Sequence, residues 1–147
     1  MANRFAHSIH ETKNSELKAI ASTNNERLKN FGDTYDINSK YRFNSYDDIL
    51  NCNDINSIYI STLNNTHADI IIRTIQAKKN VLCEKPITTS FSETTKIFEK
   101  LNDSNVFFLE AIAYRTHPQT QFVLNKIKEN EIGEVKKIVS TFGYHTR

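Results

Sequence analysis

The sequence contains little glycine and little cysteine. Glycine occurs only three times in 147 residues, at Gly32, Gly133 and Gly143, and none of the three lies near the amino terminus. The two cysteines, Cys52 and Cys83, are far apart in the chain and lack Cys-x-x-Cys spacing. They therefore predict neither a disulfide framework nor a zinc site. Their use indicates a reduced, cytoplasmic setting.

Long apolar runs and a large excess of charge are also missing. No run approaches the length of a membrane span, and the polar amino terminus lacks the pattern of a signal peptide. The net charge is +2 without a basic cluster, so neither a membrane nor a nucleic acid is an expected partner. Charged residues make up 24% and aromatic residues 10%, as in ordinary globular proteins, and the chain is long enough to bury a core.

Short apolar runs alternate with helical patterns along the chain. The patterns predict strands at about 17–21, 41–43, 57–61, 81–83, 106–109 and 134–144, and helices at about 1–12, 24–31, 46–50, 69–78, 90–101 and 119–130. Asn24 or Asn25, Ser45, and Ser90 or Ser92 are expected to cap the helices at 24–31, 46–50 and 90–101. Gly32 is expected to close the second helix, and Phe91 is expected to belong to the apolar stripe of the helix at 90–101. This spacing implies βαβ crossovers, so the predicted fold class is α/β, a doubly wound, Rossmann-like parallel sheet.

The stretch Val81-Leu82-Cys83-Glu84-Lys85-Pro86 carries the clearest chemistry. Pro86 cannot donate to a sheet ladder, so the strand must end here and leave Glu84 and Lys85 at its carboxyl edge. Ligands of open α/β sheets bind at that edge. A lysine beside a carboxylate can serve there as a proton donor or a positive clamp. A surface salt bridge between the two residues is the alternative interpretation.

Several motifs occur in a specific order. The succession STLNNTH after a strand, VLCEKP, EAIAYRTHPQ and GEVKKI resembles the Gfo/Idh/MocA oxidoreductases, and the EAIAYRTHPQ stretch is most similar to the branch of dihydrodiol and D-xylose dehydrogenases. The resemblance covers nearly the whole chain. It implies a Rossmann domain that binds NAD(H) or NADP(H), followed by a β-rich substrate domain. The expected reaction is hydride transfer to or from a sugar, polyol or related hydroxy or carbonyl compound.

The resemblance assigns a role to each residue of the Glu-Lys-Pro motif. Lys85 matches the family's catalytic lysine and would donate a hydrogen bond or a proton to the substrate oxygen during hydride transfer. Glu84 would orient the lysine or contact the cofactor. Pro86 would shape the turn, and a cis Lys85-Pro86 bond is a hypothesis that follows.

The loop after the third strand matches the family's T-P-N-x-x-H. Thr62, Asn64 and His67 occupy the cofactor-binding positions, and Leu63 replaces the proline. A histidine at a helix start can instead be a cap or simply have its hydrogen bonds satisfied within the fold, so both readings of His67 stay open.

Two further elements bear on the cofactor. Arg115 matches the arginine of the family's YRxHP element, near the nicotinamide, with an ion pair to Glu110 or Glu84 as the alternative. At the end of the second strand, neutral Ser22 leaves room for a 2′-phosphate and Arg27 lies one turn further on, so NADP is favoured over NAD.

The family's first strand and glycine-rich turn are expected before Ala2, where only Met1 stands. We therefore expect a fragment: residues 1–131 as an incomplete cofactor domain that lacks its first strand and Gly-rich loop, and residues 132–147 as the first strand of a second domain. The full-length form is expected to be a homo-oligomer acting on carbohydrate-like molecules. The alternative is a non-catalytic remnant or an oligomerising nucleotide-binding module. Motifs of response regulators and metal hydrolases are lacking, and no metal site is predicted.

Overall fold

The computed structural model describes residues 1–143 and residue 145. The chain divides into two compact units, Met1–Ala111 and Ile112–Arg147, and each is treated separately below. None of the described helices is long and apolar enough to cross a membrane. The predicted division at residues 131 and 132 rests on the expected second domain and stays a prediction.

The first unit alternates strands and helices, as the sequence predicted. Its helices are α1 (Ala2–His10), α2 (Asn25–Thr34), α3 (Tyr46–Asn51), α4 (His67–Gln76) and α5 (Phe91–Asn102), with short 3-10 helices at Ser39–Tyr41 and Asn64–Thr66. Its strands are β1 (Ile20–Ala21), β2 (Arg42–Phe43), β3 (Ser57–Ile60), β4 (Asn80–Cys83) and β5 (Phe108–Glu110).

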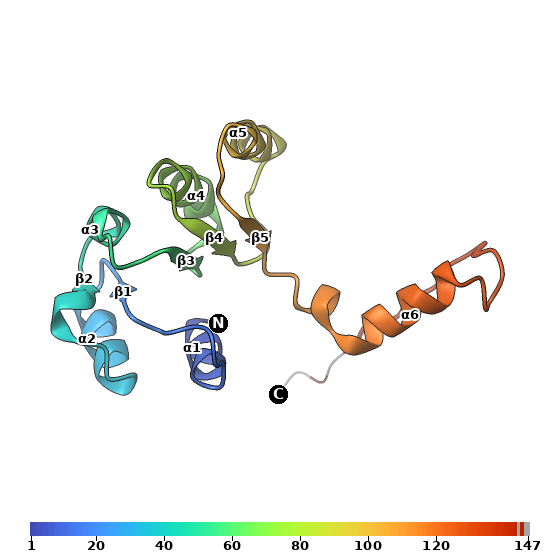
Figure 1. Ribbon diagram of the computed structural model, residues 1–147, viewed down its shortest axis with the longest axis horizontal. Coiled ribbons are helices and arrows are strands. Elements are labelled where there is room, and N and C mark those ends of the chain that lie inside the picture. The colour runs from blue at the N-terminus through green and yellow to red at the C-terminus, as the bar shows by residue number, and fades with distance from the viewer. Residues whose placement is uncertain (144, 146–147) are drawn as a thin grey trace. The chain divides into compact units, whose positions relative to one another are not determined.

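All strand pairs are parallel, which confirms the predicted α/β class. β1 pairs with β2 in one sheet, and β3, β4 and β5 pair in that order in a second sheet (Figure 1). No ladder joins β1 to β3 within the part of the chain that the structure describes. The sheet is therefore interrupted between these two strands, in agreement with the expectation of a doubly wound sheet that lacks a strand.

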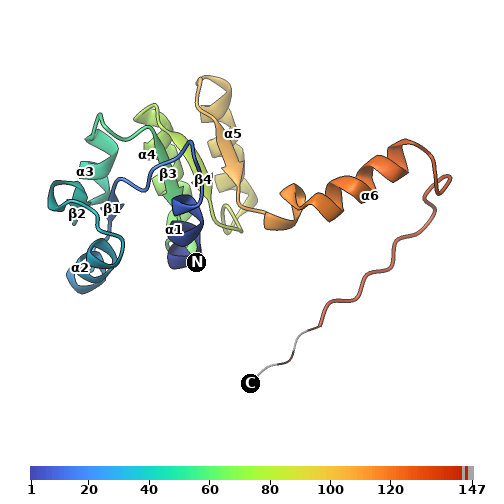
Figure 2. The same ribbon diagram turned by 60° about the horizontal axis from the view of Figure 1, so that its bottom comes forward.

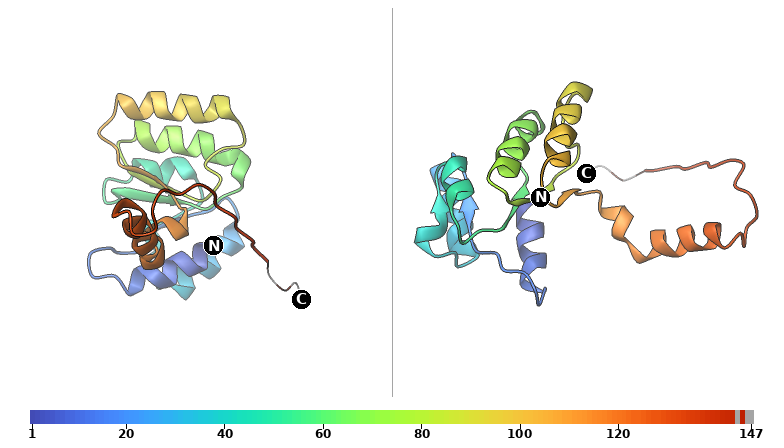
Figure 3. Two further views of the ribbon diagram at one scale, coloured as in Figure 1. Left: turned by 90° about the vertical axis from the view of Figure 1, so that its right-hand side faces the viewer. Right: turned by 45° about the horizontal axis from the view of Figure 1, so that its top comes forward.

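Helices cover both faces of the three-stranded sheet. α4 and α5 lie side by side on one face (Figure 3), and α1 lies on the other, where Phe5 stacks on Tyr59 of β3 (Figures 1 and 2). The core lies between the sheet and α4, because these elements carry the continuous apolar runs. Its most deeply buried side chains are Ile60, Ile71, Ile97, His67, Val81, Thr74 and Cys83.

Polar residues begin three helices where the sequence predicted caps. The side-chain oxygens of Asn24, Ser45 and Ser90 accept hydrogen bonds from amides in the first turns of α2, α3 and α5. The prediction that Gly32 ends α2 was wrong, because the helix continues to Thr34. The expected apolar role of Phe91 was also wrong: the ring is 87% exposed, since it stands at the first position of α5.

The second unit begins with a 3-10 helix, Ala113–Thr116, and continues into α6 (Pro118–Lys128). His117 caps α6 through its ring, which accepts a hydrogen bond from the Gln119 amide. α6 buries no residue within this unit. The strand predicted at 134–144 is not formed by residues 134–143, because they find no partner strand, and position 144 lies outside the described residues.

Candidate functional site

The carboxyl ends of β3 and β4 lie next to each other and position the two sequence motifs together. Ile60 of β3 is in register with Cys83 of β4, and the Glu84 amide donates to the Ile60 carbonyl at 2.9 Å. The polar loop at 61–66 and the Glu84-Lys85-Pro86 turn therefore begin at the same edge of the sheet. This is the edge at which open parallel sheets bind their ligands.

His67 joins these two loops. Its ring is fully buried, with Nδ1 2.9 Å from the Pro86 carbonyl and Nε2 3.2 Å from the Thr62 carbonyl. A neutral imidazole can donate to only one of these oxygens at a time. Both ring nitrogens face carbonyl oxygens of the fold and one of them is hydrogen-bonded there, in agreement with the reading of a histidine bonded within the fold. The contact of His67 with a cofactor stays a prediction.

Glu84 is held by Tyr59 rather than by Lys85. The Tyr59 hydroxyl donates to Oε1 of Glu84 at 2.6 Å, and the Tyr59 ring stacks on Phe5 with 3.8 Å between centroids. Burial, and next the hydrogen bond to Glu84, raise the pKa of the Tyr59 phenol, so it remains a proton donor to the carboxylate. The half-buried Glu84 carboxylate thereby has a fixed orientation.

Lys85 is exposed and has no ion-pair partner in the described part of the chain. The alternative reading of a Glu84–Lys85 surface salt bridge was therefore wrong, because Glu84 turns to Tyr59. The Lys85-Pro86 bond is cis, as the resemblance suggested. The lysine amine is thus available to a ligand at the sheet edge.

Glu110 is a site residue that the sequence reading treated only as an ion-pair partner. It ends β5 in register with Cys83, and its Oε1 accepts from the Ile87 amide at 3.1 Å. Glu110 and His67 therefore hold the N–H and the C=O of the peptide group that links Pro86 to Ile87. A signal for Glu110 was present in the sequence, because an acidic residue directly follows an apolar strand there, as Glu84 does.

In the polar loop after β3, some side chains make hydrogen bonds within the loop and others are exposed. The hydroxyls of Thr62 and Thr66 are 2.7 Å apart, and Thr66 also donates to the Leu63 carbonyl. Asn64, by contrast, is exposed at the start of its 3-10 helix. The Thr62 hydroxyl thus already makes a hydrogen bond within the loop, whereas Asn64 is exposed to solvent. Their contacts with a cofactor stay predictions.

Ser22 and Arg27 lie together around the start of α2. The Ser22 hydroxyl accepts from the Asn24 amide at 3.2 Å, and the Arg27 amide donates to Oδ1 of Asn24 at 2.9 Å. The Arg27 side chain is exposed. Arg115 lies in the second unit, where its carbonyl accepts from Nε2 of Gln121 at 2.6 Å, and its predicted role stays a prediction.

The cysteines do not extend this site. Burial raises the pKa of the Cys83 thiol to about 12, so it stays protonated at neutral pH. Cys52 is half-buried, and both cysteines are free. Among residues 1–143 and 145, no group of His, Cys, Asp and Glu could hold a metal ion.

Comparison with known proteins places this geometry in context. The chain is 30% identical to a trans-1,2-dihydrobenzene-1,2-diol dehydrogenase of Xenopus laevis over 128 residues, which is 87% of this chain and 38% of that protein. It is 33% identical to D-xylose 1-dehydrogenase (NADP(+)) 2 of Haloferax volcanii over 129 residues, which is 88% of this chain and 39% of that protein. The chain thus spans less than half the length of these relatives.

The fold matches as well. A crystal structure of a 3-ketoreductase from Actinomadura kijaniata in complex with NADP superposes with a TM-score of 0.76 and 27% identity, covering 88% of this chain and 40% of that one. The model of the oxidoreductase family with an NAD-binding Rossmann fold matches residues 1–112. With its parallel sheet and its Glu84-Lys85-Pro86 turn, the chain belongs to the Gfo/Idh/MocA oxidoreductase family.

Proposed function

We propose that this chain forms the nicotinamide-binding part of an NAD(P)-dependent oxidoreductase that acts on a sugar, a polyol or a related hydroxy or carbonyl compound. One observation carries the proposal: Lys85 is exposed at the carboxyl edge of β4 and has no ion-pair partner among the described residues, while Tyr59 fixes Glu84 and His67 contacts Pro86 on its two sides. A lysine that is free between two anchored neighbours has a defined position without a competing partner.

Lys85 has the chemistry that this reaction needs. Its ammonium group donates a hydrogen bond to a carbonyl oxygen and gives up a proton as that oxygen becomes a hydroxyl. In the opposite direction the amine takes the proton from the alcohol. A nicotinamide cofactor supplies or accepts the hydride. Glu84, held by Tyr59, fixes the backbone from which Lys85 extends.

The residues at the sheet edge fit a dinucleotide with a 2′-phosphate. Ser22 is neutral and half-buried, and Arg27 is exposed in the first turn of α2 with no ion pair to any described residue. We assign these residues to the 2′-phosphate of NADP and the exposed Asn64 to the nicotinamide side. The name of the Haloferax relative and the NADP-bound 3-ketoreductase support NADP over NAD.

The remaining expectations form part of the same proposal. The substrate is a small carbohydrate-like molecule, Arg115 contacts the nicotinamide side of the cofactor, and the functional form is a homo-oligomer in the cytoplasm. The substrate class agrees with the names of the D-xylose dehydrogenase and the 3-ketoreductase. Two free cysteines agree with a reduced compartment.

A fluorescence titration with NADPH tests the cofactor assignment. We expect saturable binding, with Arg27→Ala weakening NADPH about tenfold and leaving NADH unchanged, because only NADPH carries the 2′-phosphate. Lys29→Ala is the matched control, since Lys29 lies on the same helix but pairs with Asp33. A folded chain that binds neither NADPH nor NADH would contradict the proposal.

Reduction of NADP with D-xylose, by a full-length protein in which the expected substrate domain follows this chain, tests the assignment of Lys85. We expect Lys85→Met to abolish NADPH formation while the affinity for NADPH changes less than about threefold, because the lysine acts on the substrate oxygen. Lys96→Met on α5 is the control. Cofactor binding without hydride transfer by that unmodified full-length protein with any of a panel of sugars and polyols would instead favour the nucleotide-binding module.

A further inference from the structure

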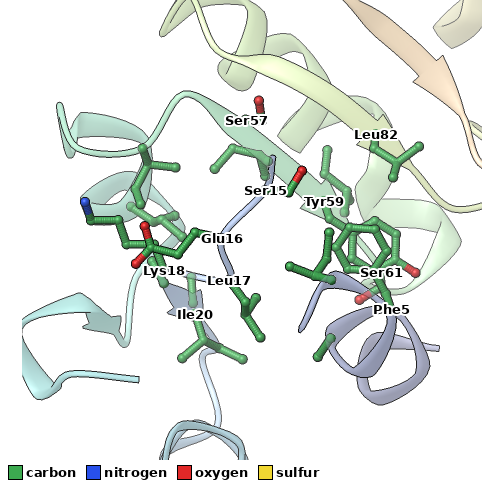
Figure 4. Close-up of a pocket in the computed structure, with 18 of the residues that line it drawn as sticks. Phe5, Ser15, Glu16, Leu17, Lys18, Ile20, Ser57, Tyr59, Ser61 and Leu82 are labelled. Carbon is green, nitrogen blue, oxygen red and sulfur yellow. The ribbon is translucent and has the colours of Figure 1, made fainter. Parts of the chain in front are cut away.

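The turn that carries Lys85 is anchored from both faces of the three-stranded sheet. On the α1 face, the Tyr59 hydroxyl donates to Glu84, the residue before the lysine. Tyr59 lies against Phe5 there, in the wall of a cavity of about 1140 Å³ (Figure 4). This contact holds the chain just before Lys85, and the chain just after it is held separately.

Glu110 provides the second anchor, on the face where α4 and α5 lie. Phe108, two residues earlier in β5, packs against the core and edge to face with Phe98 of α5. Alternate residues of a strand share a face, so Glu110 stands on the same side. Its Oε1 accepts from the Ile87 amide at 3.1 Å, across 23 positions in sequence. An anchor from β5 thus reaches the turn at the end of β4.

This hydrogen bond holds the peptide group directly after Pro86. Pro86 has no N–H, so the Ile87 amide is the first backbone donor that follows Lys85. The carbonyl of the same peptide group lies 2.9 Å from Nδ1 of His67. Both polar groups of this planar unit are therefore contacted, one from α4 and one from β5, and its orientation is fixed.

Glu110 has no other evident role in the fold. It is half-buried and makes no ion pair with any described residue. Taking a carboxylate partly out of water costs free energy unless hydrogen bonds replace the lost solvation. It also stands in the core-facing row of β5, where Phe108 is apolar. An acid at this position is explained by its bond to the Ile87 amide and not by packing.

We propose that Glu110 is a positioning residue for Lys85: by holding the Ile87 amide, it fixes the turn from which the lysine amine reaches the substrate oxygen. Because this role concerns Lys85, it rests on the proposed function. Displacing reacting groups by about 1 Å can slow a reaction about 100-fold, so an anchor in the turn affects the rate without contacting the substrate. The required feature is an acceptor oxygen at the reach of a glutamate side chain, and not the negative charge.

Two substitutions separate the reach of this side chain from its charge. Glu110→Gln keeps the length and an oxygen that accepts from the Ile87 amide, but it removes the charge. Glu110→Asp keeps the charge, but its side chain is shorter by a methylene group. We therefore expect the hydrogen bond to persist in Glu110→Gln and to be lost in Glu110→Asp.

Steady-state kinetics of the full-length protein, with NADP and D-xylose or the best substrate of the sugar and polyol panel, tests the effect on the reaction. We expect kcat to fall about tenfold or more in Glu110→Asp and less than about threefold in Glu110→Gln. KM for the substrate and the affinity for NADPH should change less than about threefold in both, because the lysine is misplaced while the binding surfaces are kept. Glu99→Asp, at an exposed position of α5, is the matched control and should leave kcat unchanged.

Hydrogen exchange in the same proteins, read by mass spectrometry with fragmentation to single amides, tests the anchor without using the reaction. The Ile87 amide should exchange about tenfold faster in Glu110→Asp and at the natural rate in Glu110→Gln. The amide of Ile71 in α4 is the internal reference, since it lies inside a helix.

Several outcomes would overturn the proposal. Equal kcat values of Glu110→Asp and Glu110→Gln would do so, as would equal exchange of the Ile87 amide in all proteins. Loss of Ile71 protection in Glu110→Asp would do so too, because Glu110 would then support the whole fold. An unchanged kcat in Glu110→Asp, alongside the expected loss in Lys85→Met, would overturn this role and leave the proposed function standing. Absence of hydride transfer by the natural protein would instead overturn the proposed function, and with it this role.

Discussion

The two sheets of the first unit are held together by different forces. The β3 half, residues 57–111, packs its three strands against α4 and α5 and fully buries Ile71 and Ile97. The β1 half, residues 20–43, has only two residues in each strand, and its buried apolar side chains are Ile37 and Leu28. The β3 half is stabilised mainly by apolar packing, and the β1 half has much less of this packing.

Polar contacts of Arg42 stabilise the β1 half, where apolar packing is sparse. Its Nε donates to the Ile37 carbonyl at 2.6 Å, and its guanidinium pairs with Asp33 at 2.5 Å. Gly32 makes room for this side chain: a Cβ at that position would lie 2.4 Å from Nε of Arg42. A single arginine thus links α2, the turn after it and β2.

This difference bears on the proposed cofactor site. Lys85 and His67 belong to the packed half, whereas Ser22 and Arg27 belong to the half that depends on polar contacts. Regions with few buried apolar contacts open at lower free energy than packed cores. We therefore infer that the end proposed for catalysis is the more rigid one and that the end proposed for the 2′-phosphate is more easily deformed.

The largest predicted effect is on the packed half. Ile71→Ala removes a side chain with no exposed surface from the middle of the core, so we expect the free energy of unfolding to fall by about 3 kcal/mol. Chemical denaturation followed by circular dichroism measures this change. Leu63→Ala, at a residue that is 75% exposed, should change the same quantity by less than about 0.5 kcal/mol. Equal effects of the two substitutions would refute the assignment of the core.

Local signals in the sequence were sufficient for much of the fold. Asn24, Ser45 and Ser90 were found because a cap depends on residues within one turn of itself. The turn at Lys85 and Pro86 was found because proline ends a strand whatever surrounds it. The parallel sheet followed from the spacing of apolar runs, which a crossover connection requires.

Contacts between distant segments were not predicted, because no local pattern encodes them. Tyr59 reaches Glu84 across 25 positions in sequence, and His67 reaches Pro86 across 19. Gly32 was read as a helix end, although its lack of a side chain serves Arg42 ten residues later. These contacts were missed, and Gly32 was misread, for one reason. The role of each residue depends on which distant segment becomes its neighbour in the fold.

A smaller effect is predicted for the β1 half. Gly32→Ala favours the helix by about 1 kcal/mol, but the new methyl group displaces Arg42 and breaks its bond to the Ile37 carbonyl. A hydrogen bond from a charged donor contributes about 2 kcal/mol, so we expect a net loss of about 1 kcal/mol in the free energy of unfolding. Urea denaturation of both chains measures it.

A double-mutant cycle gives this prediction its control. In an Arg42→Ala background the displaced side chain is gone, so Gly32→Ala should become stabilising by about 0.5–1 kcal/mol through helix propensity alone. The change of sign is the informative result. If Gly32→Ala destabilises both backgrounds equally, then Arg42 is not the reason for glycine at this position.

The smallest predicted effect is the contribution of Asp33 to stability, which should depend on pH. Hydrogen bonds from Lys29 and then Arg42 lower the pKa of the Asp33 carboxyl below its ordinary value of 3.8. A carboxyl whose pKa is lower in the folded state contributes stability above the unfolded value and loses it as the pH falls through the folded value. The difference in unfolding midpoint between the natural chain and Asp33→Asn should therefore be present at about pH 6 and shrink towards zero near about pH 2. Because Asp33 is exposed, the difference should be small and should also decrease in high salt. A difference that stays constant over this pH range would show that the Asp33 charge does not support the β1 half, and that the Arg42 bond to Ile37 acts alone.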